Sequence, residues 1–159
     1  MNMENKKSKV GISDSFKTNK DLKGIFELTI RDRSGKIIEK YEDKNLIVDR
    51  ARFNMAHLIG QSGNSVYIDA IGFGTGTAAP VPEDLVLTGS TEFAFDAVTY
   101  PDNNAVAFLW SLGYDDLVGM TITEFGLISN NGDLFSRKVR AAIVKSDDFT
   151  VNGKWTILF

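Results

Sequence analysis

Residues 121–145 read TITEFGLISNNGDLFSRKVRAAIVK and decide the fold. Their first eight residues are largely β-branched or aromatic, a composition that favours a strand. Asn131-Gly132 then predicts a tight hairpin turn, because asparagine and glycine both tolerate positive φ. Residues 134–145 return as the second strand. This stretch therefore predicts an antiparallel hairpin.

A second Asn-Gly pair, Asn152-Gly153, lies further along the sequence. It predicts another hairpin, which joins residues 149–151 to a strand at 154–159. Trp155, Ile157 and Phe159 share one face of that strand, because alternate residues of a strand point to the same side. Such a strand lies either in the interior of its own sheet or at an edge, where it pairs with a partner protein. We therefore take Trp155, Ile157 and Phe159 as candidates for an assembly interface.

Other strands are predicted upstream of this region. Residues 24–32 alternate in polarity, with Phe26, Leu28 and Ile30 on the inward face. A turn at residues 32–35 leads to a hairpin partner at 36–42. Further strands are predicted at 66–73, 91–100 and 105–112, which brings the total to about eight.

One helix is predicted, at about residues 46–60. Its apolar residues recur at helical spacing and form a single stripe, which consists of Val48, Ala51, Met55, Leu58 and Ile59. Gly60 is a natural end for the helix. Asn45 or Asp49 would cap its beginning.

Together these elements predict a mainly β fold, a single antiparallel β-sandwich or barrel-like domain at residues 24–159 with one α-helix. A chain of 159 residues buries roughly 70% of its unfolded surface and needs no disulfide to hold its core. Residues 1–23 are polar and lysine-rich and predict an extended or flexible N-terminal arm. We expect Val10, Ile12 and Phe16 to anchor this arm on a neighbouring subunit, the alternative being a frayed terminus.

Composition argues against several classes of function. The chain has no cysteine, which removes disulfides, thiolate metal sites and cysteine nucleophiles. The net charge of −3 is too small to indicate a specific nucleic-acid partner or a membrane partner. The charge is uneven, because residues 1–23 hold six lysines and three acids (+3), so residues 24–159 sum to −6. No apolar run predicts a secretory signal or a membrane-spanning helix, so we expect synthesis in the cytoplasm of the host cell.

Residues 74–79, GTGTAA, match the dinucleotide-binding pattern G-x-G-x-x-G/A and follow a predicted strand. The pattern binds a pyrophosphate where a helix begins directly after it. Pro80 and Pro82 stand where that helix would run, and both remove hydrogen-bond donors. We therefore predict no cofactor. Gly72, Gly74 and Gly76 are interpreted as a tight glycine loop that needs positive φ or a close backbone approach.

The remaining polar patterns predict neither catalysis nor a metal site. His57 is the only histidine, so a histidine-rich zinc site is excluded, and no Gly-x-Ser-x-Gly elbow accompanies it. The acid pairs at 115–116 and 147–148 lie in predicted turns without EF-hand spacing and are interpreted as solvated. The basic run at 137–140 alternates between two faces of a strand, which favours a solvated strand edge.

Five motifs follow one another within residues 24–159: KNLIV at 44–48, IGFGTGTAAP at 71–80, ITEFGL at 122–127, GDLFSRK at 132–138 and WTILF at 155–159. In this order they resemble a group of small structural proteins of tailed bacteriophages and prophages, encoded among tail, baseplate or tail-fibre genes. The resemblance implies a virion component that is not an enzyme, such as a tail, neck or collar ring subunit or a fibre-attachment adaptor. Its partners would be further copies of itself and other tail, neck or fibre proteins.

The residues are compatible with this expectation, because a β-rich module with exposed edges and a terminal arm suits assembly into a symmetric oligomer. The alternative is a carbohydrate-binding or host-receptor-binding β-sandwich module. Its aromatic candidates for stacking on a sugar are Tyr67, Tyr100, Trp110 and Tyr114, of which Trp110 lies on an apolar face and suits the core better. A third reading, a cell-wall hydrolase carried on the particle, finds no support in the motifs.

Overall fold

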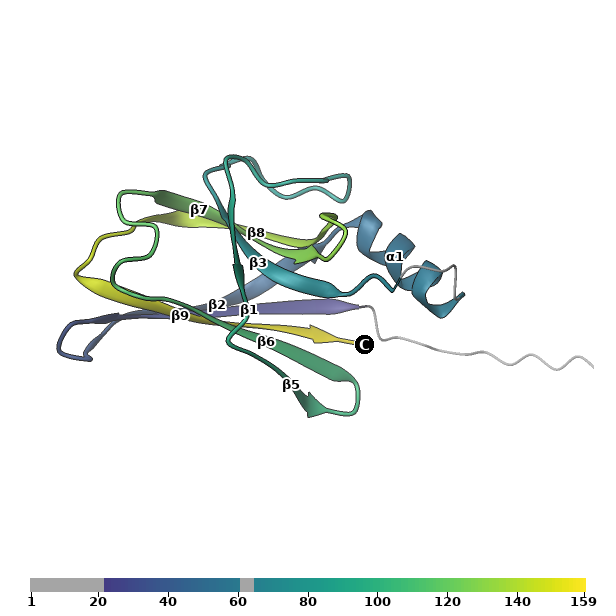
Figure 1. Cartoon of the computed structure of the whole chain (residues 1–159), viewed down its shortest axis with the longest axis horizontal. Helices are drawn as coiled ribbons and strands as arrows, with labels where there is room; N and C mark the ends of the chain where they lie inside the picture. Colours follow the sequence, from purple (N-terminus) through teal and green to yellow (C-terminus); the bar gives the residue numbers. More distant parts are fainter. Residues whose placement is uncertain (1–21, 61–64) are drawn as a thin grey trace, which may run out of the picture.

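The computed structural model describes residues 22–60 and 65–159, which form nine β-strands and one α-helix. The paired strands in this part of the chain are all antiparallel and join into one curled sheet (Figure 1). The mainly β, barrel-like fold with one helix is therefore confirmed. The elements are β1 (Lys23–Asp32), β2 (Ile37–Ile47), α1 (Asp49–Ile59), β3 (Ile68–Gly74), β4 (Thr91–Ala94), β5 (Ala97–Asp102), β6 (Ala105–Leu112), β7 (Thr121–Ser129), β8 (Leu134–Val144) and β9 (Phe149–Leu158).

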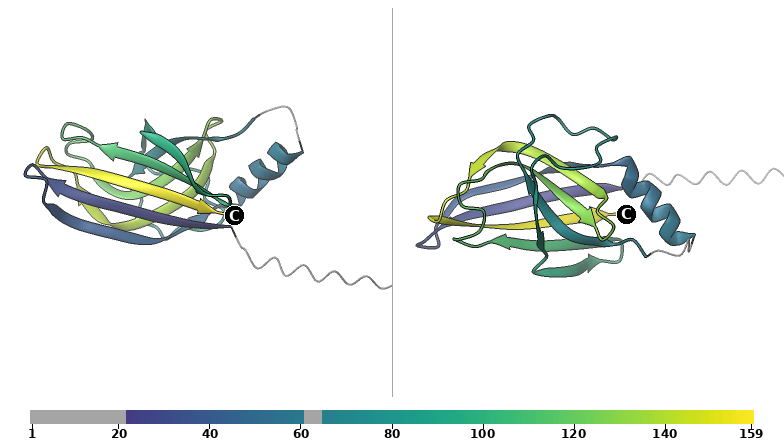
Figure 2. Two further views of the ribbon diagram at one scale, coloured as in Figure 1. Left: turned by 90° about the horizontal axis from the view of Figure 1, so that it is seen from below. Right: turned by 45° about the horizontal axis from the view of Figure 1, so that its top comes forward.

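The order of the strands explains why the sheet curls. It runs β4-β3-β7-β8-β2-β1-β9-β6-β5, so its two edges are β4 and β5. These edge strands are consecutive in the chain, and Phe95 and Asp96 alone separate them. Because so short a link joins them, the two edges approach each other at that corner. The sheet bends into an incompletely closed barrel (Figure 2).

Two of the expected hairpins are present. β1 and β2 are joined by a turn in which Gly35 has φ of 82°, and Asp32 Oδ1 accepts hydrogen bonds from the backbone N–H groups of Ser34 and Lys36. β7 and β8 are joined by the turn at Asn131-Gly132, where Gly132 has φ of 84°. Glycine is needed at both positions because positive φ costs other residues strain.

The hairpin predicted at Asn152-Gly153 is wrong, because β9 runs through both residues without a turn. Asn152 pairs with Thr29 of β1 on one side and with Ser111 of β6 on the other. The reason for the glycine is packing: a Cβ at Gly153 would overlap the indole ring of Trp110. The absence of a side chain at Gly153 thus makes room for the indole ring of Trp110.

The single strand predicted at residues 91–100 is in fact two strands on opposite edges of the sheet. β4 pairs with β3, whereas β5 pairs with β6. The two residues between them are Phe95 and Asp96. Neither is a glycine or a proline, so the sequence does not mark the break. This division adds one strand to those predicted, and the continuous β9 removes one, because residues 149–151 and 154–159 were expected to be separate strands.

The helix is shorter than predicted and begins without a side-chain cap. Val48 stands at the N-cap, where Asn45 or Asp49 was expected. Asn45 is unavailable because its side-chain amide donates to the hydroxyl of Ser136 on β8. The apolar stripe is buried at its beginning, at Val48 and Ala51, whereas Leu58 and Ile59 are exposed near its end. The stripe therefore covers the core only in part.

Aromatic side chains form the centre of the core. The ring of Phe26 on β1 lies 4.8 Å from that of Phe125, 5.0 Å from that of Trp155 and 6.1 Å from that of Trp110, measured between centroids. These four rings come from four different strands and are almost fully buried. The inward placement of Phe26, Leu28 and Ile30 is confirmed. Clustered rings of this kind contribute beyond their buried area.

Candidate functional site

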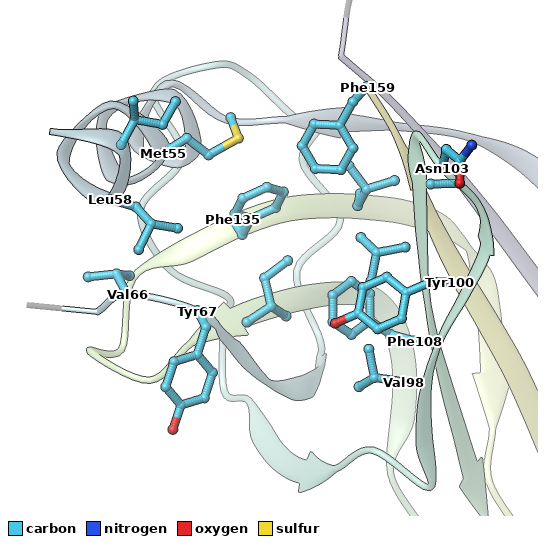
Figure 3. Close-up of a pocket in the computed structure, with 15 residues that line it drawn as sticks. Met55, Leu58, Val66, Tyr67, Val98, Tyr100, Asn103, Phe108, Phe135 and Phe159 are labelled. Atoms are coloured by element: carbon cyan, nitrogen blue, oxygen red, sulfur yellow. The ribbon is translucent and has the colours of Figure 1, made fainter. Parts of the chain in front are cut away.

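An apolar groove of about 830 Å³ is formed by the described residues (Figure 3). It lies at the end of the molecule where α1 lies and β9 ends, as the ribbon of Figure 1 places these elements. Residues from five strands and the helix line it, together with the segment before β3, the β5–β6 turn and the residue after β9. They are Met55, Leu58, Ile59, Val66, Tyr67, Ile68, Val98, Tyr100, Asn103, Ala105, Val106, Phe108, Phe135, Ile157 and Phe159. None of these residues has a charged side chain. The groove can therefore take an apolar partner but offers few groups for a polar one.

Large apolar side chains at the rim of this groove are exposed to solvent. The exposed fraction is 87% for Ile59, 78% for Tyr100, 58% for Tyr67 and 49% for Phe159. Leu58 and Val98 also stand exposed on the same rim. Figure 3 shows Tyr67 and Tyr100 on opposite sides of the opening. Contiguous exposed apolar surface of this kind marks interaction sites on proteins.

The groove lies beside β5, which is an edge strand, and beside the beginning of β3, which extends beyond its partner β4. β4 pairs with residues 70–73 of β3, so Ile68 at the beginning of β3 has no partner on β4. β5 pairs with β6 on one side, and no other strand of the described chain pairs with its second side. All six residues of β5 are exposed. Pro101 in this strand fits an edge position, because proline cannot donate a backbone hydrogen bond.

The structure separates the three predicted interface residues of the last strand. Trp155 and Ile157 are fully buried, since β9 is seated between β1 and β6 in the interior of the sheet. Ile157 also reaches the floor of the groove. Phe159 stands at the rim, and its backbone is held by Asn104, whose carbonyl accepts from the N–H of Phe159 at 2.9 Å. The proposed arm residues Val10, Ile12 and Phe16 lie outside the described residues.

The glycine cluster lies away from the groove, against the side chain of Glu124. Cβ atoms at Gly74 and Gly76 would come within 2.5 and 2.7 Å of its carboxyl group, so both positions need glycine for close approach. At Gly72 a Cβ would meet the side chain of Leu87 instead. None of the three has positive φ. Of the two reasons expected for these glycines, close approach is the one the structure bears out.

Glu124 holds the loop of residues 75–90 against the sheet. Its Oε1 accepts hydrogen bonds from the backbone N–H of Gly76 at 3.0 Å and of Thr88 at 2.5 Å. Its Oε2 accepts from Nε of Arg137 at 2.8 Å, and Nη1 of Arg137 donates to Asp84 of the same loop at 2.9 Å. Burial opposes the charge of Arg137, but the hydrogen bonds to Asp84 and Glu124 outweigh it and raise the pKa of Arg137.

The prediction of a solvated edge for the basic run 137–140 is therefore wrong. Arg137 and Lys138 are buried, and Lys138 donates to Asp43 Oδ2 at 2.5 Å. This hydrogen bond lowers the pKa of Asp43. Arg140, on the same face as Lys138, donates to Glu39 at 2.7 Å. Each cation of the run sits in an ion pair between β8 and its surroundings, which sequence alternation alone cannot reveal.

A buried lysine lies between β8 and β9. Nζ of Lys145 donates to the backbone carbonyls of Tyr114 at 3.0 Å and Ser146 at 2.7 Å, and it lies 5.3 Å from the ring centroid of Phe149. Burial disfavours its charge and lowers its pKa, although Asp116, Asp115 and Asp147 act in the opposite direction. Three acids of the pairs at 115–116 and 147–148, which were expected to be simply solvated, therefore act on the charge of a buried lysine.

Within the described residues, no group of three or more acidic or histidine side chains is arranged to hold a metal ion. His57 is exposed on α1, with its ring 4.1 Å from that of Phe53. It borders a smaller polar pocket of about 460 Å³ that also includes Arg50, Asn54 and Asp133. Asn54 and Arg50 contact the carboxylate of Asp133, which ties α1 to the β7–β8 turn.

The aromatic residues proposed for sugar stacking divide into three groups. Trp110 is buried in the core, as its apolar face indicated. Tyr114 is covered by the guanidinium of Arg33, 4.6 Å from its ring centroid. Tyr67 and Tyr100 are exposed at the groove. Only these last two therefore present an open ring face for a ligand among the four candidates.

Sequence reasoning missed the groove as a site. Its walls come from segments far apart in the sequence, so no local pattern contains it. The sequence held one indication of this site. Val98 and Tyr100 lie on the same face of a strand that also contains Pro101, a pattern that is typical of an edge strand with one apolar face.

The single helix of the described residues, α1, is not long and apolar enough to span a bilayer. Comparison of the chain with protein-family models, with curated proteins and with solved structures gave no match.

Proposed function

We propose that this chain is a structural subunit of a tailed bacteriophage virion, in the tail, neck, collar or fibre-attachment region, that assembles into a symmetric oligomer. The motif order along residues 24–159 supports the phage assignment. The observation that carries the assembly role is the apolar groove beside the uncovered edge strand β5. An exposed apolar rim is costly for an isolated protein and is explained when a partner covers it.

Edge pairing is the mode of contact that this surface supports. The backbone groups on the outer side of β5 can pair with an added strand, while Val98 and Tyr100 offer apolar contacts for its side chains. Repetition around a symmetric particle multiplies a weak contact, so a modest interface at each subunit suffices. We propose other tail, neck or fibre proteins as further partners, and the virion as the site of the protein.

Two measurements test this proposal. Light scattering across a concentration series should give a discrete oligomer or a mass that rises with concentration. Mass spectrometry of particles purified from cells that express the gene should find the chain in stoichiometric amounts with the other virion proteins. A strict monomer that is absent from the particles would refute the proposal.

A carbohydrate-binding or host-receptor-binding module is the second candidate, because Tyr67 and Tyr100 present exposed rings on either side of the groove (Figure 3). It ranks below assembly since the groove supplies few polar side chains, whereas sugar recognition needs hydrogen bonds as well as stacking. A glycan array tests it. Specific binding that is lost in both Tyr67→Ala and Tyr100→Ala would favour this function, and silence across the array would count against it.

A further inference from the structure

We propose that the groove receives residues 10–16 of a neighbouring copy of the chain, which add to the sheet as a tenth strand. This inference rests on the proposed assembly function and names the segment that fills the site. The groove lies beside both the beginning of β3 and the strand β5, whose outer side pairs with no other described strand. Both of these segments line the groove, and each has an uncovered side.

The sequence of residues 10–16, VGISDSF, suits this place. Alternate residues of a strand point to the same face, so Val10, Ile12 and Phe16 would all face one way, together with Asp14. The opposite face would carry Gly11, Ser13 and Ser15, which are small or polar. Three of the four residues on the first face suit the apolar groove, with Asp14 as the exception, and the opposite face tolerates solvent. The segment thus combines a mainly apolar face with backbone groups that can pair with a strand edge, the two properties that strand addition needs.

The position of β1 sets how far the arm that precedes it must reach. Lys23 pairs with Leu158 of β9, Leu158 with Ala105 of β6, and Ala105 with Asp102 of β5. A strand added outside β5 would lie four strand spacings from β1, about 19 Å at ~4.8 Å each. The six residue steps from Leu22 to Phe16 span at most about 20 Å. Because the sheet is curled, the straight distance is shorter than this path, so the chain's own arm is also long enough to reach the groove. The experiments below therefore distinguish the chain's own arm from that of a neighbouring copy.

Charge favours the same pairing. Lys9 and Lys17 directly flank the segment 10–16, and Asp96 and Asp102 lie at the two ends of β5, where both are exposed. Residues 1–23 carry +3 and residues 24–159 carry −6. Opposite charges at the two ends of an added strand speed its encounter with the edge and disfavour pairing between two like edges.

This contact would determine the symmetry of the assembly. The arm and the groove are different surfaces, so each copy donates to one neighbour and accepts from another. A contact of this head-to-tail type closes into a ring, or continues as a filament where the rotation does not close. A symmetric dimer formed by two β5 edges would be a different, self-complementary arrangement.

The absence of cysteine from the chain allows a direct test by disulfide cross-linking of full-length protein. Chains that carry Tyr100→Cys are mixed with chains that carry Val10→Cys, Ile12→Cys or Phe16→Cys, and then oxidised. Matched controls carry Gly11→Cys, Ser13→Cys or Ser15→Cys. Mixed disulfides are identified by the masses of the linked peptides, which separates them from homodimers. We expect at least one residue of the first set to cross-link five-fold or more above every control.

A chain that carries both Ile12→Cys and Tyr100→Cys distinguishes the source of the arm. Multimeric ladders on a non-reducing gel support exchange between copies, whereas a purely intramolecular disulfide overturns the inference. Equal cross-linking of the two sets would overturn it as well.

Light scattering of Phe16→Asp, with Ser15→Asp as its control, separates this inference from the function on which it rests. Loss of the oligomer in Phe16→Asp alone supports the arm contact. An oligomer that persists in Phe16→Asp, together with cross-linking that shows no preference, overturns the arm contact and leaves the assembly function standing. A wild-type chain that is monomeric throughout and missing from particles overturns both.

Discussion

Arg137 on β8 and Glu124 on β7 form an ion pair inside the protein. Nη2 of Arg137 lies 2.6 Å from Oε2 of Glu124, and the two side chains are 6% and 0% exposed. The remaining oxygen of Glu124 holds the 75–90 loop through the backbone of Gly76 and Thr88. One carboxylate thus contacts both a neighbouring strand and the sixteen-residue loop between β3 and β4. Its removal should therefore lower the stability of the fold considerably.

We predict that Glu124→Gln lowers the free energy of unfolding by about 3–5 kcal/mol, because it leaves the buried charge of Arg137 without its main partner. Urea denaturation followed by fluorescence measures the change. Glu27→Gln is the matched control, since Glu27 pairs with Lys154 in a partly exposed position and should cost less than about 1 kcal/mol. Equal effects of the two substitutions would contradict a structural role for the buried pair.

Gly153→Ala should destabilise the protein by about 1–3 kcal/mol, because the added methyl group meets the indole of Trp110 and forces it to move. The near-ultraviolet circular dichroism of the tryptophans should change as well. Asn152→Ala tests the adjacent, exposed position and should stay within about 0.5 kcal/mol of the wild type. An unchanged tryptophan signal in Gly153→Ala would mean that the indole does not depend on this glycine.

Ile59→Ser should reduce oligomer formation several-fold in light scattering while it changes the unfolding free energy by no more than about 0.5 kcal/mol. The reason is that Ile59 is exposed in the single chain but belongs to the groove. Phe53→Ser is a control on the same helix, because Phe53 is also exposed but borders the smaller polar pocket. If both variants assemble like the wild type, this end of α1 takes no part in the contact.

Lys145 should give the protein a measurable alkaline stabilisation. Its pKa is lowered by burial, so between that folded value and the ordinary value of 10.5 the unfolded state binds more protons than the folded state. The contribution of Lys145 to the unfolding free energy therefore rises with pH across this window, and below it that contribution is constant and unfavourable, because the charged group is buried. We expect the wild type to gain stability relative to Lys145→Met as the pH increases towards 10.5. A constant difference from neutral pH upwards would show that the lysine is not titrating differently in the two states.

The sequence was informative where a local rule determines local structure. Gly35 and Gly132 mark turns because the backbone there needs positive φ, and the alternation in residues 24–32 places Phe26 in the core. These features depend on neighbours in the chain. The fold class followed from their repetition along the sequence.

The rest depends on contacts between distant residues. Gly153 resembles a turn glycine, but its role is set by Trp110, 43 positions earlier in the chain. The run at 137–140 looks solvated until Glu124, Asp84 and Asp43 are placed beside it. The groove likewise appears only when β3, β5 and α1 meet. Each of these depends on strand order, which a periodic pattern does not encode.

The placement of β1 between β2 and β9 has a consequence for biosynthesis. β1 is the first of the nine strands to leave the ribosome and β9 is the last. One side of β1 therefore stays without its partner while residues 33–148 are translated, and the core around Phe26 lacks Trp155 throughout that time. At about 5–20 residues per second this interval lasts on the order of ten seconds. The nascent chain thus exposes one unpaired edge of β1 for much of its synthesis, and a holdase chaperone is the means by which a cell would protect that edge.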